Sequence, residues 1–463
     1  MKDKMNKILN QSNIIILSII ALILVYSCSK DDGGGGDDNV VVVKTPTLNV
    51  NKTSIQFDDT MITKSSNSST FSVSSQNVNS EVSLVTSGEF ELSKDNLVYS
   101  KSLTLEANES KTLYVRFSPT TIGAQTGSIN ITNSQVSQKT VSLSGEGIKL
   151  RHNYKTYNQE HLAFGSGLSQ SSIKTFDLHD DVSNIESIKM YVDLDCPSAG
   201  CNAWDVFANI LVKEPTSNEW LEIGRYITPY GVDTSALDRG IEIDVTDFKS
   251  LLAGTVELRA YIEVWGSDGW NLNVEFDYVE GEPDYKYYQI SRVVQYNKNS
   301  LEGVIYGEDQ SEFDMTKTIT ISDEVESTHL RTIITGWGHA TPADSDGRRC
   351  AEWCFRTHSV KINGASKFQH NMNGIGCGNN PINNQAGNWS PDRAGWCPGM
   401  AVPLRIDKFN EDMSNSTFEY DYGFQAWTNN LQTDASNKHA YYAISTFIVL
   451  KSNENISAAS VVD

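Results

Sequence analysis

The chain has 463 residues, with 58 acidic and 37 basic side chains and a formal net charge of −21 at pH 7. This length exceeds what one hydrophobic core normally supports and predicts about three domains. The acidic balance argues against nucleic-acid binding, because acidic side chains repel the phosphate backbone.

Residues 1–28 have the pattern of a bacterial export signal. Lys2, Lys4 and Lys7 precede an apolar run, 14–25, that is too short to span a bilayer and has the length of a signal-peptide core. The segment resembles a lipoprotein signal in which Cys28 is the lipidated first residue of the mature protein. Residues 29–46 read as a flexible tether rich in Asp and Gly. Such acidic patches resemble those that send lipoproteins of Bacteroidetes-type bacteria to the outer face of the outer membrane, so we expect an exterior-facing lipoprotein or a secreted protein.

Residues 47–148 alternate apolar and polar side chains between turn signals, which predicts a β-sandwich. Leu113, Val115 and Phe117, for example, fall on one face of a strand. The string from 105 to 147 resembles Ig-like domains of the ASPM, SPD-2 and hydin type, which serve as spacers or adhesion modules. Cysteine and any catalytic constellation are absent from this range, so we interpret it as a stalk.

The remainder also has a strand pattern and weak helical periodicity, so the whole chain is predicted to be all-β. A charged connector at 281–288 divides it into two antiparallel sandwiches, 149–282 and 283–456, with the boundary near Pro283. Residues 457–463 are expected to form a disordered tail.

Six cysteines remain after Cys28, and export with an even count favours disulfides. Near spacings suggest the pairs Cys196–Cys201, Cys350–Cys354 and Cys377–Cys397, although six cysteines permit many connectivities. A metal site is the alternative, because Cys350, Cys354 and His358 recur at the spacing of zinc ligands on a helix.

The segment 336–358 concentrates groups suited to sugar recognition. A disulfide between Cys350 and Cys354 would fix Glu352 beside Trp353. An indole can cover the C–H face of a pyranose, and a shielded carboxylate can accept hydroxyl hydrogen bonds or carry a raised pKa. The alternative is a stapled surface loop with a solvated Glu. His339 could act as a general base or simply bond within its loop.

Strand register predicts two further carboxylates near tryptophans. In 204–212 the even positions form an apolar face that includes Trp204, which leaves Asp205 on the other face. In 256–265 the odd positions place Glu263 and Trp265 away from the core. For each of these two acids, the alternative is an ordinary solvated carboxylate on a half-exposed strand.

A long loop, 374–400, carries Trp389, Arg393 and Trp396 between Cys377 and Cys397. Long ordered loops are usually functional, so these residues suit a saccharide or peptide rim. They could equally pack a small core of the loop itself.

Amide hydrolysis needs a group that activates water and a donor for the leaving nitrogen, roles that Asp and Glu share when their environments separate their pKa values. The sequence has no GxSxG elbow, and each cysteine has a plausible partner. A glycoside hydrolase using two of the same acids, and a glycan-binding adhesin without turnover, are the competing hypotheses.

Several strings are together similar to the peptide:N-glycosidase F family, an amidase family with two jelly-roll domains. They include CPSAGCNAWD, GRYITPYGV, GIEIDVTDFKSLLAG, LRTIITGWGHA, CAEWCFRTH and NPINNQAGNWSPDRAGWCPGMAVP, and they run from about 173 to 452. The resemblance implies that Asp205 acts at the bond between asparagine and N-acetylglucosamine. Glu352 would help to hold the substrate and a water, and Glu263 would assist through water.

The resemblance also implies the three disulfides above and N-linked glycoproteins and glycopeptides as substrates. No metal or cofactor is expected, since carboxylates and fixed dipoles can suffice, and we expect a monomer. The residues expected to bind substrate are Trp204, Trp265, Trp337, His339, Trp353, Arg393 and Trp396. One departure is Val206, which stands where the best-known family member has an Arg beside the catalytic Asp. The smaller side chain suggests space for a fucose on the first N-acetylglucosamine.

Overall fold

The computed structural model describes residues 44–297, 303–306, 313, 315–340, 343, 345–426 and 440–463. Regular structure in these ranges is almost entirely β-strand, which confirms the all-β prediction; two short 3-10 turns are η1 (Thr246–Phe248) and η3 (Cys377–Asn379). Within the same ranges, no helix has the length and apolarity needed to cross a membrane. The predicted signal 1–28, the lipidation site Cys28 and residues 29–43 of the tether lie outside the described residues.

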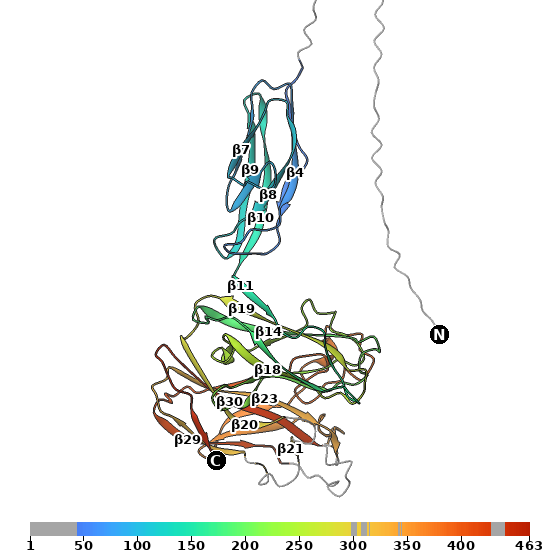
Figure 1. Ribbon diagram of the computed structural model, residues 1–463, viewed down its shortest axis with the longest axis vertical. Coiled ribbons are helices and arrows are strands. Elements are labelled where there is room, and N and C mark those ends of the chain that lie inside the picture. Colours follow the sequence, from blue (N-terminus) through green and yellow to red (C-terminus); the bar gives the residue numbers. More distant parts are fainter. Residues whose placement is uncertain are drawn as a thin grey trace, which may run out of the picture.

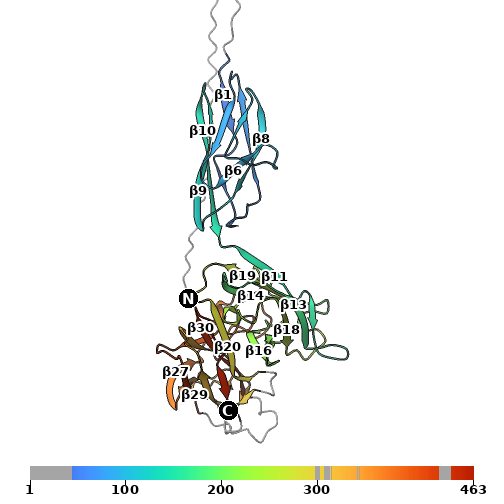
Figure 2. The ribbon, with the colours of Figure 1, turned by 60° about the vertical axis from the view of Figure 1, so that its left-hand side comes forward.

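Ten strands form a separate N-terminal sandwich of two sheets, at one end of an elongated molecule (Figure 1). The alternation predicted for Leu113, Val115 and Phe117 holds, because all three are buried in the core between the sheets. Figure 2 shows the last strand of the sandwich leading directly into the next domain. Resemblance of this unit to Ig-like domains stays a prediction. One sheet has the order β1 (Thr47–Val50), β4 (Ser69–Gln76), β8 (Ser110–Phe117), β6 (Phe90–Ser93); the other has β2 (Ser54–Gln56), β10 (Val136–Ile148), β9 (Gly123–Asn133), β5 (Val82–Thr86), β7 (Ser102–Leu105), with β3 (Thr60–Met61) on β10.

The first jelly roll is an antiparallel two-sheet sandwich built from β11 to β19. Its core includes Val256, Leu258, Ala260, Ile262 and Val264, the even positions predicted to face inward. One sheet has the order β11 (Arg151–Lys155), β19 (Trp270–Glu280), β14 (Ile185–Asp195), β17 (Ile241–Asp244), with β12 (Glu160–Leu162) on β19; the other has β13 (Ser171–Asp177), β18 (Thr255–Ile262), β15 (Phe207–Lys213), β16 (Trp220–Ile227).

The second jelly roll repeats this architecture with a core of its own. A small hairpin, β24 (His339–Ala340) with β25 (Cys350–Ala351), lies beside its two sheets. One sheet has the order β20 (Tyr287–Tyr296), β30 (Tyr441–Ser452), β23 (Ser327–Trp337), β28 (Arg405–Lys408), with β21 (Val304–Ile305) on β30; the other has β27 (Ala365–Asn371), β26 (Thr357–Ile362), β29 (Ser416–Gly423), β22 (Thr316–Ile321), β31 (Ser460–Val462).

The prediction of a disordered tail at 457–463 is wrong. Strand β31 pairs with β22, and Thr318, Ile319 and Thr320 lie opposite Val462, Val461 and Ser460. The two β-branched valines suit an edge strand, and the pairing gives β22 a partner on its free edge.

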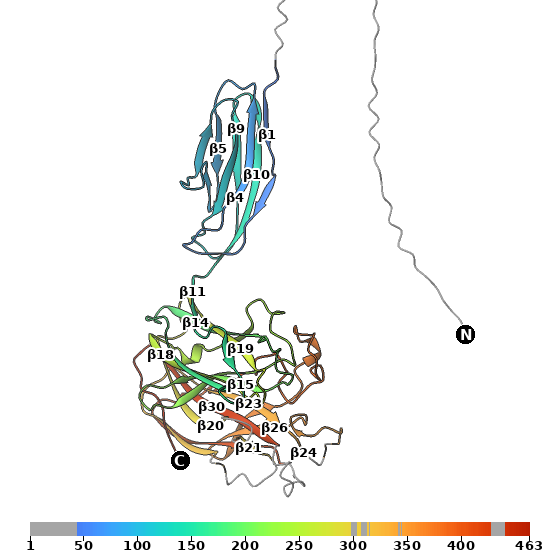
Figure 3. The same ribbon diagram turned by 45° about the vertical axis from the view of Figure 1, so that its right-hand side comes forward.

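The two jelly rolls meet at a seam where the sheet of β15, β16 and β18 packs on the sheet of β20, β23 and β30 (Figure 3). Phe447 and Val449 of β30 belong to the core of the first jelly roll. Consecutive residues of β15 are buried, because one face covers its own core and the other is covered by the second jelly roll.

A buried ion pair of the first jelly roll lies at this seam and bonds to the second jelly roll. Arg225 and Glu222 of β16 have no exposed side-chain area, and Arg225 Nη2 lies 2.8 Å from Glu222 Oε2. Arg225 Nη1 also donates to Thr335 Oγ1 (2.9 Å) and to the carbonyl of Ala443 (2.7 Å) on the second jelly roll. Buried charges need such complete partners, so the pair fixes how the two sheets dock.

Candidate active site

Asp205 lies at the seam, just before β15 begins at Phe207. The loop that carries Asp205 follows the disulfide Cys196–Cys201. Thr228 bonds to the residues on both sides of Asp205. The Thr228 hydroxyl donates to the carbonyl of Trp204 (3.1 Å) and accepts from the amide of Val206 (2.9 Å). The Asp205 side chain is thereby fixed in place with only 10% of its area exposed.

Glu352 comes from the second jelly roll, in a turn closed by the disulfide Cys350–Cys354. The amide of Glu352 donates to the carbonyl of Gly338, and its own carbonyl accepts from the amide of Ala394. Its side chain is 12% exposed. The alternative of a solvated Glu on a surface loop therefore does not describe this residue.

Arg393 joins the two carboxylates. Its Nη2 lies 3.1 Å from Asp205 Oδ2, and its Nε donates to Glu352 Oε1 at 3.1 Å. The guanidinium is fully buried and lies over the rings of Trp353 and Trp396, with its carbon 4.6 and 5.0 Å from their centroids. One buried cation thus holds two acids that are 147 residues apart in the chain, a separation given by their sequence numbers.

Glu263 is the third acid at this place. It follows β18, is buried, and its amide donates to the carbonyl of Phe207, two residues beyond Asp205. Burial raises the pKa of the Tyr441 phenol well above its usual value, and the nearby carboxylates of Glu263 and Glu352 raise it further. The structure therefore brings the three predicted acids to one part of the seam.

The electrostatics single out Asp205. Burial raises the pKa of its carboxyl to about 7, since desolvation penalises the charged form more than the nearby Arg393 guanidinium favours it. The Glu352 carboxylate raises this pKa further, and a hydrogen bond with Tyr230 lowers it. Asp205 Oδ2 is buried and accepts no hydrogen bond, although Arg393 is close. This carboxyl can therefore exchange a proton near neutral pH.

His339 bonds Glu352 through a shared nitrogen. Its Nε2 lies 2.9 Å from Glu352 Oε2 and 2.8 Å from Nε1 of Trp353. One nitrogen cannot donate to the carboxylate and accept from the indole at once, so the protonation of Nε2 selects its partner. The bond to Glu352 raises the pKa of His339, which favours the imidazolium form and argues against a role as free base.

The predicted aromatic residues divide into exposed and buried groups. Trp204 and Trp265 are 68% and 60% exposed beside Asp205 and Glu263, and Phe164 packs edge to face on Trp265 at 5.1 Å between centroids. Trp337 and Trp353 are half-buried. Trp204 departs from its predicted place on the apolar face, because β15 begins only at Phe207 and Trp204 lies in the loop before it.

Arg393 and Trp396 lie beneath the surface and not on an exposed rim, and their contact with substrate stays a prediction. Both side chains are fully buried, and Trp396 packs with Ile227 and Ile333 between the two jelly rolls while its indole donates to the carbonyl of Gly336. Arg393 holds the two carboxylates by ion pairs, and Trp396 packs against its guanidinium. Val206, the departure from the family pattern, is half-buried against the core of the first jelly roll.

Sequence reasoning missed Tyr230 and Tyr441, which contact or face the acids. Tyr230 lies in the string GRYITPYGV between β16 and β17, where nothing in its spacing marks it as functional. Tyr441 begins β30 and looks like an ordinary core tyrosine. Only folding brings either phenol to the carboxylates.

The three predicted disulfides are present, which removes the alternative of a zinc site at Cys350, Cys354 and His358. Among the described residues, one cluster has three potential metal-ligand atoms close together, Cys377, Asp392 and Cys397, but both cysteines are bonded to each other. Disulfide sulfurs have no thiolate to offer a metal.

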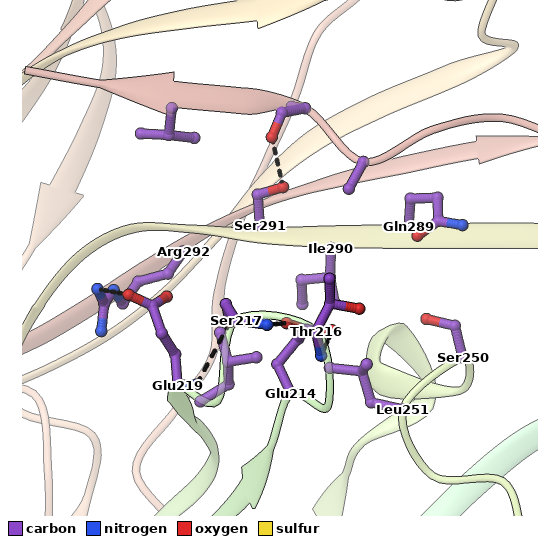
Figure 4. A pocket seen from close by; sticks show the side chains of 14 residues that line it. Glu214, Thr216, Ser217, Glu219, Ser250, Leu251, Gln289, Ile290, Ser291 and Arg292 are labelled. Carbon is purple, nitrogen blue, oxygen red and sulfur yellow. Dashed lines mark hydrogen bonds and ion pairs between the residues drawn. The ribbon is translucent and has the colours of Figure 1, made fainter.

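A pocket opens elsewhere on the seam, between 214–221 and β20 (Figure 4). There Glu219 forms an ion pair with Arg292, and Ser291 donates to the carbonyl of Ala459. The Glu214 carboxylate accepts from the amides of Thr216 and Ser217. The charged groups of this pocket thus already have partners within the protein, and none of the three acids lines it. The site at Asp205 remains the candidate for chemistry.

Comparison with known proteins places these features in a family. Residues 305–449 match the family model described as peptide-N-glycosidase F, C terminal. The chain is 53% identical over 310 residues to peptide-N(4)-(N-acetyl-beta-D-glucosaminyl)asparagine amidase F of Elizabethkingia miricola, covering 67% of this chain and 86% of the relative.

Solved structures agree with this match. PNGase F, a glycosylasparaginase from Flavobacterium meningosepticum, is 52% identical with a TM-score of 0.65, covering 68% of this chain and 100% of that one. The structure of PNGF-II is 11% identical with a TM-score of 0.56 and covers 81% of this chain and 100% of its own, so it supports the fold alone.

Proposed function

The chain belongs to the peptide-N-glycosidase F family, and we propose that it hydrolyses the amide bond between an asparagine side chain and the innermost N-acetylglucosamine of N-linked glycoproteins and glycopeptides. The asparagine becomes aspartate, and the glycan leaves as a glycosylamine. The high identity to the amidase of Elizabethkingia miricola over most of that protein supports this reaction.

The observation that carries the proposed chemistry is the pair Asp205 and Glu352, held from two domains by the buried Arg393. We assign Asp205 the proton transfers. Its ionised carboxylate removes a proton from water as the water oxygen adds to the amide carbon, and it then returns that proton to the leaving nitrogen. A pKa of about 7 suits both steps, because a group near the working pH can both accept and donate.

Glu352 would hold the attacking water and the substrate, and Glu263 would assist through water. Arg393 occupies one oxygen of Glu352 and His339 approaches the other, so the orientation of this carboxylate is fixed before substrate arrives. The exposed indoles of Trp204 and Trp265 offer apolar faces to sugar rings beside Asp205.

The test is to incubate the protein with an N-glycopeptide in heavy-oxygen water and to weigh the peptide. Amide hydrolysis converts the asparagine to aspartate and places one heavy oxygen in its carboxyl group. A glycoside hydrolase would leave a sugar on unaltered asparagine. A glycan-binding protein without turnover would return the glycopeptide unchanged, and either result would refute the proposal.

We further propose that the protein is an exported, monomeric lipoprotein that faces the cell exterior. The support is the signal-like segment 1–28 and the acidic tether that follows it. Labelling cells with a radioactive fatty acid should mark the wild-type protein and leave a Cys28→Ser variant unlabelled. Equal labelling, or none in either, would contradict the anchor.

A further inference from the structure

Tyr230 stands out among the buried groups to which the proposed chemistry assigns no role. Its ring is buried at the seam, and its hydroxyl accepts a hydrogen bond from Arg393 Nη2 at 2.8 Å. The same nitrogen lies 3.1 Å from Asp205 Oδ2. Burial, and next the charge of the nearby Asp205 carboxyl, raise the pKa of Tyr230, so a phenol that accepts from a guanidinium also keeps its own proton beside that carboxyl.

The long loop 374–400 of the second jelly roll, called here the cystine loop, holds Tyr230 from three sides. Gln385 Oε1 accepts from the amide of Tyr230 at 3.0 Å, and the amide of Ala386 donates to its carbonyl at 3.0 Å. Gly387 lies flat on the ring, since a Cβ there would be 2.2 Å from Tyr230 Cδ1. Only glycine permits this approach, because any side chain would displace the ring or the loop.

These contacts of Gln385, Ala386 and Gly387 with Tyr230, called the clamp below, are themselves connected to the disulfide of the cystine loop. Gln385 Nε2 donates to the carbonyls of Ile382 and Pro398, so its amide group is fully used. Pro398 follows Cys397, which is bonded to Cys377. Thus the cystine loop, predicted from the sequence to form a substrate rim, contacts and positions Tyr230 of the first jelly roll.

On the basis of the proposed function, we propose that Tyr230 is a positioning residue that fixes the Asp205 carboxylate for proton transfer, and that the cystine loop serves to place it. In the proposed arrangement the phenol, which accepts from Arg393, turns its own proton to Asp205 and so links the acid to the cation that also holds Glu352. The groups that face Asp205 are Arg393 and Glu352 from the second jelly roll and Tyr230 from the first.

The decisive variant is Tyr230→Phe, which keeps the ring packed against Gly387 and removes only the hydroxyl. Loss of a donor to the ionised carboxylate favours the protonated form of Asp205. The acidic limb of the kcat/KM profile should therefore move to higher pH by about one unit, and kcat at neutral pH should fall roughly 10- to 100-fold. Tyr226→Phe is the matched control: its hydroxyl is also buried but has no partner, so both the limb and the rate should stay at wild-type values.

Gly387→Ala tests the clamp. It should move the acidic limb in the same direction as Tyr230→Phe while the domains stay folded, as judged by tryptophan fluorescence. An acidic limb that does not move in Tyr230→Phe, whatever happens to the rate, would reduce the phenol to a packing role and overturn the proposal.

A second measurement does not depend on activity. At each pH, the unfolding free energy is compared between proteins with and without the Asp205→Asn substitution. This difference, followed over pH, gives the pH dependence of stability that Asp205 contributes. In the Tyr230→Phe background the upper end of this dependence, set by the pKa of Asp205 in the folded state, should move upward by about one pH unit, while the lower end, set by the unfolded chain, stays in place. If this shift appears in a protein that releases no glycan, the inference holds and the proposed function fails. If glycan is released but neither the profile nor the stability curve shifts, the function holds and the inference fails.

Discussion

Asp205→Asn should stabilise the protein above neutral pH while it abolishes glycan release. The wild-type carboxyl is 10% exposed, and burial raises its pKa from 3.8 to about 7. Asparagine has the same shape without the charge. Because the reactive carboxylate is costly to bury, removing its charge should relieve the folded state.

The magnitude follows from linkage. The folded state keeps a proton on Asp205 that the unfolded chain releases near pH 4, so the wild type loses stability relative to the variant as pH rises between about 4 and 7. Three pKa units correspond to about 4 kcal/mol, an upper bound reached above pH 7. Below pH 4 the carboxyl is protonated in both states, and the two stability curves should run parallel.

The assay is urea denaturation at a series of pH values, followed by tryptophan fluorescence. All nine tryptophans lie between 204 and 427, so the signal reports on the two jelly rolls and ignores the N-terminal sandwich. Glycopeptide digestion runs in parallel. If the stability difference between the wild type and Asp205→Asn does not change between pH 4 and 8, the argument that burial raises the pKa of Asp205 is refuted. Persistent glycan release by the variant would refute the catalytic role of Asp205.

Three further variants probe other parts of the site. Arg393→Met leaves two buried carboxylates facing each other without their cation, so we expect a loss of activity and about 3–5 kcal/mol of stability in urea at pH 8, shrinking in acid as the carboxylates protonate; equal stability at pH 8 would contradict the bridging role. Trp265→Ala removes an exposed indole and should raise KM while the free energy of unfolding stays within about 0.5 kcal/mol of wild type; an unchanged KM would remove Trp265 from the substrate surface. Val206→Arg should reduce release of glycans with an α1,3-fucose on the first N-acetylglucosamine more than release of bare cores, and failure of the wild type on fucosylated glycopeptides would contradict the idea that Val206 leaves room for it.

Sequence patterns predicted the strands well where one face of a strand meets one core. In β18 the even positions are buried as expected, because alternate side chains of a strand point to opposite faces. The same reasoning fails in β15, whose consecutive residues are buried because both of its faces are covered. A pattern within one strand contains no information about a second domain that packs on its outer face.

The chain by itself determined the all-β class, the near-spaced disulfide pairs and, through the resemblance of its strings, which three acids to look for. Only the tertiary structure decided the environment of those acids. It buries Arg393 between Asp205 and Glu352 and brings Tyr230 of one domain against Gly387 of the other. A side chain's chemistry and short-range spacing are written in the sequence, whereas its pKa depends on desolvation and on charges that arrive from residues far along the chain.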